Sequence, residues 1–484
     1  MLVASGCSGV DDDVVVAGTA ASTTTTSSTT TTTTTTTTTV PPTTAAPTTV
    51  ATTSTSAPRT STATTTSTGG GNKAQAYQTQ LAAAITDIQA YWRTTFPQIY
   101  KKPYKDLKGG IWRAYPGVTN VPGCGKTTSR YKSVQGNAFY CRTGADFITY
   151  DDAGLFPQLY RYYGVLALGL VLAHEWGHAI QYRANVDGET ILLEQQADCF
   201  AGSWMAHVSR GEAAGLTLGP KDLTSSLSGM LSYADPVGIT SDQQGAHGSG
   251  FDRVGAFEDG YLNGAAKCAT YPTAPPTVIE LPFTAGDAAT GGNLPYDQVV
   301  SSMGTDLDRF WGEVFQQRGK TYQPLLDGVK KYADASPYPT CGTDTSGAQF
   351  KARAAVYCAA GDFVAYDDDL LQQVNDVGDF AAGVFIGGAW ADAAQTRLGS
   401  TLAGAERSLQ QDCYTGAWAK SILPTPQTPD TQKFLLSAGD LDEGVIAFVD
   451  KSNLRDPIGG PAVPPFDRVA AFRKGILQGV AACG

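Results

Sequence analysis

The sequence predicts an α+β protein, rich in helix and with a small sheet, in which one domain is present as two tandem copies. Three observations predict this class. Blocks of similar sequence recur at a nearly constant spacing, long apolar runs with helical periodicity outnumber strand-like runs, and each copy holds its own four cysteines.

The duplication is visible in four separate blocks. The block FDRVGAFEDGYLNGAAKC, which starts at Phe251, returns 215 residues later as FDRVAAFRKGILQGVAAC. ADCFAGSW returns as QDCYTGAW at an offset of 214, AFYCRTGADFITYDD returns as AVYCAAGDFVAYDDD at 217, and DIQAYW returns as DLDRFW at 219. We therefore expect one domain over residues 72–270 and a second, related domain over residues 271–484.

The N-terminal region predicts a tether. Residues 1–18 contain the lipobox-like stretch ASGC, in which Cys7 would be lipidated, although an unmodified Cys7 in a disordered tail is the alternative. Residues 19–71 are rich in Thr, bury almost nothing on folding, and are expected to form a disordered stalk. These features predict an extracytoplasmic protein, either a lipoprotein anchored to a bacterial cell membrane or a secreted protein.

The charge of the chain argues against one class of partner. The net charge is -11, and no basic run is present, so the sequence excludes nucleic acid as an expected partner. The longest apolar candidate, Tyr163 to Ala173, is too short to span a bilayer. Membrane attachment is therefore expected only through the lipid anchor, and the sequence predicts no oligomeric state.

Within the first copy, periodicity predicts the elements in order. We expect a helix from Lys73 to Thr95, then a Cys-bearing loop and one or two strands, of which Ala138 to Tyr150 is the best strand run, and a long apolar helix from Leu159 to Tyr182. A second helix is expected from Ile191 to Ser209. A segment rich in Gly, Asp and Ser then leads to a final helix from Phe251 to Ala266.

Eight cysteines remain besides Cys7, and their spacing follows the repeat. An even count in an exported chain suggests disulfides, and each copy should be able to fold with bridges of its own. A zinc site made from these cysteines is the weaker alternative, because the chain has no CxxC pair. The expected bridges are Cys124–Cys141, Cys199–Cys268, Cys341–Cys358 and Cys413–Cys483.

The chemistry is concentrated in the segment VLAHEWGHAIQYR. His174 and His178 stand at i and i+4, so on a helix both imidazoles project from one face and can share a Zn²⁺ ion. Glu175 lies beside them, where a carboxylate can act on a water molecule at the metal. The alternative is a helix with two incidental histidines, although the whole chain has only 4 histidines.

A third ligand is expected from the next helix, LLEQQADCFAGSW. Glu194 and Asp198 share one face of an otherwise apolar run, and buried carboxylates require a partner. Glu194 would complete the set of three ligands, and Asp198 would accept a hydrogen bond from a ligand histidine. A solvated face carrying both acids, or Glu189 as the ligand, are the alternatives.

The second copy provides an internal comparison. At an offset of 214 the four residues of the expected site become Gly388, Ala389, Asp392 and Ser408, so all four are lost together. Asp412, however, keeps the position of Asp198, which indicates that Asp198 also has a structural role. The second copy is therefore expected to lack the metal site.

HEWGHAIQ, LEQQADCFAGSW and HGSGFDRVGAFEDGY, together with the upstream blocks CGKTTS, NAFYC and YDD, resemble the bacterial family called putative neutral zinc metallopeptidases. The resemblance covers about Ala74 to Cys268. It implies a zincin-like metallopeptidase domain with one zinc ion held by His174, His178 and Glu194, and with Glu175 as general base. The second copy resembles the family in its scaffold only.

The function expected from these residues is that of a cell-surface zinc peptidase. Zinc-activated water, with Glu175 as general base, would hydrolyse peptide bonds of a peptide or protein substrate. His247 is the candidate hydrogen-bond donor to the oxyanion, and a loop histidine without a role in the site is an equal alternative. Tyr150 could donate this hydrogen bond instead. The strand within Ala138 to Tyr150 could pair with the substrate. No role is expected for His207.

Two other functions stay open from the sequence. One is a non-catalytic envelope protein for binding or scaffolding, in which the zinc is structural, because the second copy keeps the fold without the site. The other is a zinc amidase that acts on cell-wall peptides with the same residues. Glu175 discriminates against a purely structural site, which has no use for that carboxylate.

Overall fold

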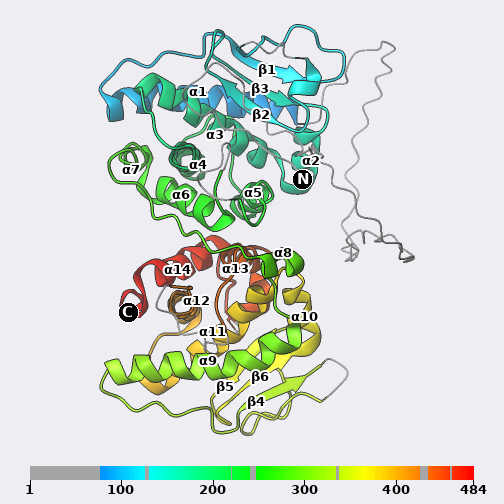
Figure 1. Ribbon diagram of the computed structural model, residues 1–484, viewed down its shortest axis with the longest axis vertical. Coiled ribbons are helices and arrows are strands. Elements are labelled where there is room, and N and C mark those ends of the chain that lie inside the picture. Colours follow the sequence, from blue (N-terminus) through cyan, green and yellow to red (C-terminus); the bar gives the residue numbers. More distant parts are fainter. Residues whose placement is uncertain are drawn as a thin grey trace, which may run out of the picture. The chain divides into compact units, whose positions relative to one another are not determined.

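The structure is a computed structural model of the chain (Figure 1). It describes residues 77–125, 130–219, 221–239, 247–333, 337–425, 434–457 and 460–484. Cys7 and the Thr-rich segment 19–71 lie outside the described residues, so the predicted lipidation site and stalk stay predictions.

The first half of the described chain combines a three-stranded sheet with a group of helices. The strands have the order β1-β3-β2, with β1 parallel and β2 antiparallel to the central strand β3, so β2 lies at an edge (Figure 1). The elements are α1 (Gln78–Tyr100), β1 (Gly110–Ala114), η1 (Tyr131–Ser133), β2 (Ala138–Cys141), β3 (Phe147–Asp151), α2 (Leu155–Tyr163), α3 (Val165–Ala184), α4 (Thr190–Ser209), α5 (Asp222–Leu231), α6 (Gly250–Asn263) and α7 (Ala265–Cys268).

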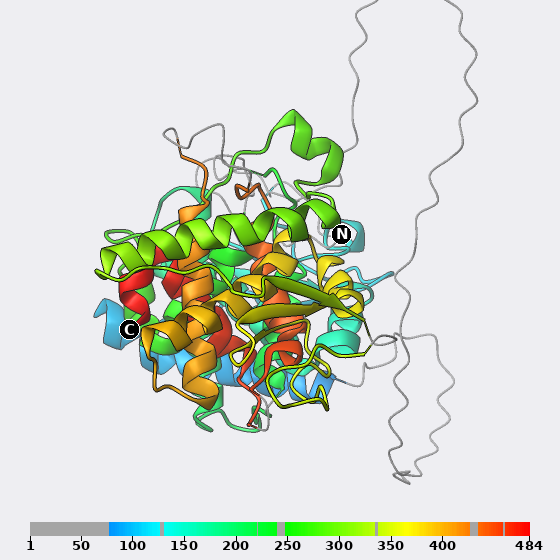
Figure 2. The ribbon, with the colours of Figure 1, turned by 90° about the horizontal axis from the view of Figure 1, so that it is seen from below.

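The second half presents the same succession after a short extra helix. Its strands have the order β4-β6-β5, again with one parallel and one antiparallel pair, and α9 packs on α11 and α12 (Figure 2). The elements are α8 (Ala285–Thr290), α9 (Tyr296–Gln317), β4 (Val329–Tyr332), β5 (Ala355–Cys358), β6 (Phe363–Asp367), α10 (Asp368–Asn375), α11 (Asp379–Leu398), α12 (Gly404–Ser421), α13 (Asp440–Asp450), η2 (Ser452–Arg455), α14 (Pro465–Gln478) and η3 (Val480–Cys483).

The predicted long helix from Leu159 to Tyr182 is wrong, because two helices occupy this region. Gly164 separates α2 from α3 and has a φ of 82°, a left-handed conformation that favours glycine and interrupts a right-handed helix. The apolar periodicity continues across the break because both helices bury residues in the same core. Apolar pattern alone could therefore not reveal the change of direction.

Other boundaries differ in smaller ways. The helix α1 continues to Tyr100, beyond the predicted end at Thr95, and the run from Ala138 to Tyr150 is a pair of antiparallel strands, β2 and β3. The final predicted helix ends at Asn263, and α7 follows after Gly264. The helix α5 lies in the segment rich in Gly, Asp and Ser, where no helix was predicted.

The helices that matter for the site pack unusually closely. A Cβ atom on Gly177 of α3 would press against the backbone of Ala197 in α4, and a Cβ on Gly202 of α4 would collide with the carbonyl of Phe257 in α6. Side chains at these positions would push the helices apart. The two glycines thus let α3, α4 and α6 approach until side chains from all three helices meet.

All four predicted disulfides are confirmed. Cys124–Cys141, Cys199–Cys268, Cys341–Cys358 and Cys413–Cys483 are bonded. The second and fourth bridges tie α4 to α7 and α12 to η3, and each closes a loop of about 70 residues, which restricts the unfolded chain strongly.

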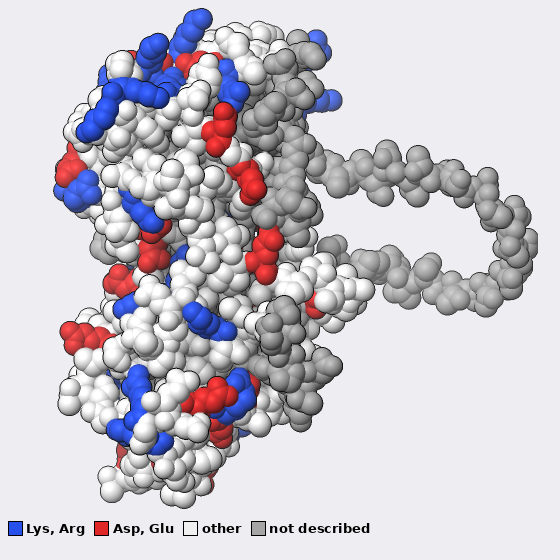
Figure 3. Space-filling model, turned by 60° about the vertical axis from the view of Figure 1, so that its left-hand side comes forward, with Lys and Arg blue, Asp and Glu red and all other residues white. Residues whose placement is uncertain are grey.

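Two surface properties complete the description. Among the helices of the described ranges, none has both the length and the apolar character needed to cross a membrane. On the face drawn in Figure 3, basic and acidic side chains lie among many uncharged residues, with several basic side chains gathered at its upper end.

Candidate metal centre

Three side chains from two helices converge at the buried junction of α3 and α4. His174 and His178 lie one turn apart on α3, and their Nε2 atoms are 3.2 Å from each other. Glu194 of α4 faces them, with Oε2 at 3.2 Å from Nε2 of His174 and Oε1 at 3.5 Å from Nε2 of His178. The arrangement follows from the i, i+4 spacing on α3 and from the close packing of α4 against it.

The spacing of these atoms fits zinc. Ligand atoms about 2.0–2.1 Å from one tetrahedral ion lie roughly 3.3–3.4 Å apart, which is close to the observed separations. Glu194 is only 1% exposed, so water does not reach its carboxylate, and neither carboxylate oxygen has a hydrogen-bond partner. A buried carboxylate without hydrogen bonds requires a cation. The three residues can therefore hold a divalent ion.

The remaining nitrogen of each imidazole is held by a neighbour. Nδ1 of His174 lies 2.7 Å from Oδ1 of Asp198, and Nδ1 of His178 lies 2.9 Å from Oε1 of Gln181. Each contact fixes the orientation of its ring and leaves Nε2 for a metal. The predicted contact between Asp198 and a ligand histidine is thus present in the structure.

Asp198 has a second partner that the sequence reasoning missed. Arg253 of α6 donates two hydrogen bonds to it, from Nε at 2.8 Å and from Nη2 at 2.9 Å. All three groups of the chain His174–Asp198–Arg253 are buried, so their charges are poorly screened. The motif FDRV occurs in both halves, and this repeated arginine was the available signal.

The charges of the cluster shift the pKa values of its members. Burial lowers the pKa of His174, but Asp198 and Glu194 outweigh burial and raise it to about 10. Burial opposes the ionisation of Glu194 and Asp198 as well. The histidines nevertheless hold the pKa of Glu194 well below its usual range, and Arg253 with His174 lowers that of Asp198 to about 2. Without metal, the cluster thus retains protons that a bound ion would displace.

Glu175 stands apart from this cluster and has a different environment. Its Oε2 accepts a hydrogen bond of 2.9 Å from the backbone N–H of Tyr140 in the edge strand β2. Its Oε1 is buried and has no hydrogen-bond partner. Burial raises the pKa of Glu175 to about 6, so this carboxyl exchanges protons near neutral pH.

His247 precedes α6 and is 1% exposed. Its Nδ1 lies 3.0 Å from Oδ1 of Asp235, while its Nε2 has no hydrogen-bond partner. The positive charge of a protonated His247 also acts on Glu194, and it contributes to the lowered pKa of that carboxyl. The predicted residue therefore lies near the three converging side chains, with one free ring nitrogen.

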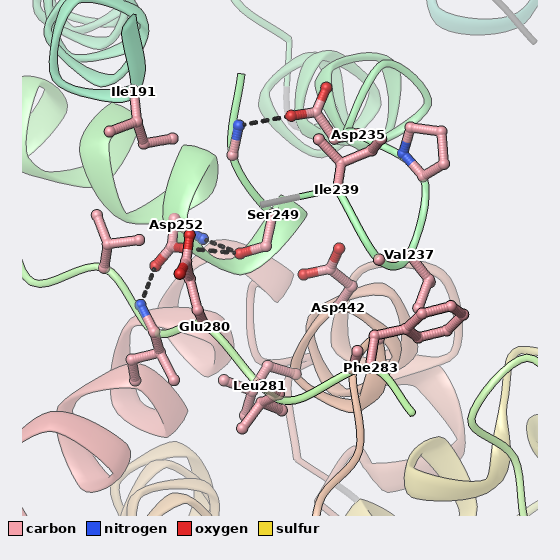
Figure 4. Close-up of a pocket in the computed structure, with 18 residues that line it drawn as sticks. Ile191, Asp235, Val237, Ile239, Ser249, Asp252, Glu280, Leu281, Phe283 and Asp442 are labelled. Atoms are coloured by element: carbon pink, nitrogen blue, oxygen red, sulfur yellow. Dashed lines mark hydrogen bonds between the residues drawn. The ribbon is translucent and has the colours of Figure 1, made fainter. Parts of the chain in front are cut away.

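A small cavity of about 80 Å³ lies beside the segment that carries His247 (Figure 4). Asp235, Ser249 and Asp252 line it from the first half, and Asp442 lines it from the second half. Asp442 accepts the backbone N–H groups of Gly250 and Phe251 at 2.9 and 2.8 Å, so it caps the first turn of α6. The second half thus holds the start of the helix that carries Arg253.

Tyr233 is a further residue that the sequence reasoning missed. Together with His174 and Glu175 it lines a narrow cavity of about 30 Å³, and its buried hydroxyl has no hydrogen-bond partner. At the offset of 215 its counterpart is Phe448, which lacks only the hydroxyl. Asp235 and Asp450 follow two residues later in each half, so the change from Tyr to Phe at this otherwise similar place could have indicated a role for the hydroxyl.

The alternative residues have other surroundings. The ring of Tyr150 stacks on Phe156 at 4.2 Å within the core, and Glu189 is exposed before the first turn of α4, outside the cluster of possible ligands. His207 lies 3.4 Å from Asp87 and 3.0 Å from Glu212, so it is a half-buried ion-pair partner.

In the second half, an arginine side chain from elsewhere in the chain lies against the position that corresponds to His174. A Cβ on Gly388, the counterpart of His174, would collide with the guanidinium of Arg455. Asp412 binds this guanidinium at 2.5 Å and also binds Arg468 at 2.7 Å. Asp198 and Asp412 therefore each balance buried arginine, Asp198 with Arg253 and Asp412 with Arg455 and Arg468.

Comparison with known proteins finds a family model that matches the first half of the chain. The model of the family described as putative neutral zinc metallopeptidase matches residues 43–271. The uncharacterized protein Rv2575 of Mycobacterium tuberculosis H37Rv is 27% identical over 225 residues, which are 41% of this chain and 71% of the relative. The uncharacterized protein YpfJ of Escherichia coli K12 is 28% identical over 211 residues, 38% of this chain and 69% of the relative. No solved structure matches the chain significantly.

Proposed function

Because residues 43–271 match the model of the family described as putative neutral zinc metallopeptidase, we propose that the first half of the chain is a zinc-dependent peptidase. His174, His178 and Glu194 would hold the ion, and Glu175 would act as general base. One observation carries the proposal: two Nε2 atoms and a carboxylate without hydrogen bonds meet within 3.5 Å in a buried site, beside a separate free carboxylate oxygen.

The residues around the ion divide the reaction between them. Bound zinc supplies Lewis acidity toward the scissile carbonyl and toward water. Oε1 of Glu175 takes a proton from the attacking water and later delivers it to the leaving amine, a role that suits its raised pKa. Nε2 of His247 and the hydroxyl of Tyr233, both buried and without a hydrogen-bond partner among the described residues, are our candidates to donate hydrogen bonds to the developing oxyanion.

The edge strand β2 is the proposed site of substrate pairing. An extended peptide can add to a sheet edge through main-chain hydrogen bonds, and β2 is an outer strand of its sheet, although its four residues are buried in this structure. The N–H of Tyr140 in β2 is held by Glu175 in this structure, so the strand and the general base share a direct contact. Pairing at β2 would bring the peptide backbone beside Glu175.

We also propose that the two halves are copies of one domain, and that the second has lost the metal site. The recurrent sequence blocks, the matching order of the elements and the identical strand orders support this. The lipid anchor at Cys7, the stalk and the extracytoplasmic location belong to the same proposal. The four disulfides support an oxidising compartment.

The test is cleavage of casein by the variant Glu175→Gln. We expect the variant to keep one zinc ion per chain and to lose activity by about 10²–10⁴-fold, because the general base is removed and the ligands are not. Glu189→Gln, which changes an exposed carboxylate near the site, is the control and should cleave normally.

Two outcomes would contradict the proposal. One is a Glu175→Gln variant that binds zinc and cleaves as fast as the wild-type protein. The other is a wild-type protein that binds zinc and cleaves neither casein nor a peptide library. The second result would favour a non-catalytic envelope protein with a structural zinc ion.

A further inference from the structure

The second half contains an open cleft at the place that corresponds to the metal centre. The cleft has a volume of about 330 Å³ and lies between β5, α11 and α12, the counterparts of β2, α3 and α4. Gly388, Ala389, Asp392 and Ser408 line it where the first half has its proposed ligands and general base. The guanidinium of Arg455 takes part of the space beside Gly388, and the remaining space forms the cleft.

Two arginines of this cleft lack an ion pair or a hydrogen bond that they could form. Within the described chain, no carboxylate forms an ion pair with Arg353, and burial lowers the pKa of its guanidinium, with Asp456 acting in the opposite direction. Arg455 also lines the cleft; its side chain is 7% exposed, and its Nε has no hydrogen-bond partner. Both guanidinium groups would gain from an anion.

The other charges of the cleft are already used. Asp392 pairs with Arg407, Asp412 with Arg455 and Arg468, and Asp456 with Arg468. Counted together with Arg353, these groups comprise four arginines and three aspartates, which leaves one positive charge in excess. The net charge of the whole chain is -11, so the cleft is locally positive on a negatively charged protein. The charge that would balance it is one carboxylate.

The cleft also has a sheet edge as one wall. Ala355, Val356 and Tyr357 of β5 line it, and β5 is an outer strand in the order β4-β6-β5. In the first half, Glu175 occupies the N–H of the corresponding strand, whereas Ala389 at the equivalent position has no acceptor to offer. An extended peptide could therefore pair with β5 without displacing a side-chain acceptor.

We propose that the second half binds an extended peptide that carries a carboxylate, with β5 pairing to its backbone and Arg353 with Arg455 receiving its carboxylate. The cleft binds such a peptide without cleaving it, because the counterparts of the general base and of the proposed metal ligands are absent. The peptide-binding assignment extends the proposed peptidase function, but it rests on the geometry of the second half and can be tested separately.

The test measures the binding of two fluorescein-labelled peptides by fluorescence anisotropy. The first has the sequence Ala-Val-Ala-Val-Glu with an amidated C-terminus, and the second has Gln in place of Glu. The protein is the full chain with Glu175→Gln, so that the probe is not consumed. We expect the Glu peptide to bind about 10–100-fold more tightly than the Gln peptide, the range for hydrogen bonds to a charged group.

Variants locate the binding. Arg353→Gln should abolish the preference for the Glu peptide, whereas Lys351→Gln, which removes an exposed charge two residues away and outside the cleft, should preserve it. Ala389→Phe should fill the cleft and weaken the binding of both peptides. Equal binding of the two peptides, or an unchanged preference in Arg353→Gln, would overturn the proposal. If the wild-type protein does not cleave casein, the proposed peptidase function alone is refuted.

Discussion

The variant Asp198→Asn tests the chain of contacts that orients His174. The substitution removes a buried negative charge, 1% exposed, which now receives two hydrogen bonds from Arg253 and lies 2.7 Å from Nδ1 of His174. An uncompensated buried charge costs about 3–5 kcal/mol. We take about 3 kcal/mol, because the Asn carbonyl still accepts one hydrogen bond, and expect a loss of roughly 6–12 °C in Tm.

The same variant should weaken zinc binding. Removing the partner of a ligand histidine typically lowers metal affinity by about 10–100-fold. The assays are thermal unfolding of the metal-free protein and competition for zinc with a chromophoric chelator. Together they separate the loss of fold stability from the loss of ligand orientation.

Asp412→Asn is the matched control in the second half. It also removes an aspartate that pairs with buried arginine, but no imidazole contacts this residue in the described structure. We expect a comparable loss of Tm with unchanged zinc affinity. The reasoning would be refuted if Asp198→Asn left zinc affinity within about twofold of the wild-type value, or if both variants weakened it equally.

Three further predictions concern the remaining contacts. Tyr233→Phe should lower kcat by about 10²–10³-fold with unchanged zinc content, as expected for one lost oxyanion donor; a wild-type kcat would exclude that role. Asp442→Ala should lower the stability by about 1 kcal/mol, because α6 loses a capping side chain, and scanning calorimetry that finds no change would show the cap to be dispensable. Burial, with Asp440 and Asp379, raises the pKa of Glu443 to about 9, so the folded state keeps a proton that the unfolded state releases above about pH 4.5. Stability should therefore fall as pH rises from about 4.5 to 9, and Glu443→Gln should raise Tm at pH 8 while leaving it nearly unchanged at pH 4; equal shifts at both pH values would contradict this reading.

Several features of the site could be predicted because they depend on local spacing. The i, i+4 separation of His174 and His178 determines their common face on any α-helix, and Glu194 and Asp198 follow the same rule on the next helix. The disulfide pairs followed from a repeat that assigns four cysteines to each half. These inferences required no knowledge of how the helices pack.

Other features depend on contacts between distant segments, which spacing does not encode. The break at Gly164 was hidden because α2 and α3 bury residues in one core. Arg253 reaches Asp198 only because α6 packs closely on α4, and Tyr233 reaches the cavity beside Glu175 from beyond α5. Asp412 pairs with Arg455, whose guanidinium lies where a Cβ on Gly388 would stand, and the sequence alone does not reveal this contact.

The amino-acid sequence was enough to predict two recurrent halves, the cysteine pairing and a set of residues that could bind a metal, because these predictions follow from residue type and from spacing along one helix or one repeat. Only the packing of distant segments shows the partners of these side chains. Arg253 donates a hydrogen bond to Asp198, Asp235 contacts His247, and Asp442 from the second half binds the backbone at the start of α6. A buried charge must be balanced by whatever group the packing brings next to it, and packing joins residues as distant as Gly250 and Asp442, which lie 192 positions apart in the chain.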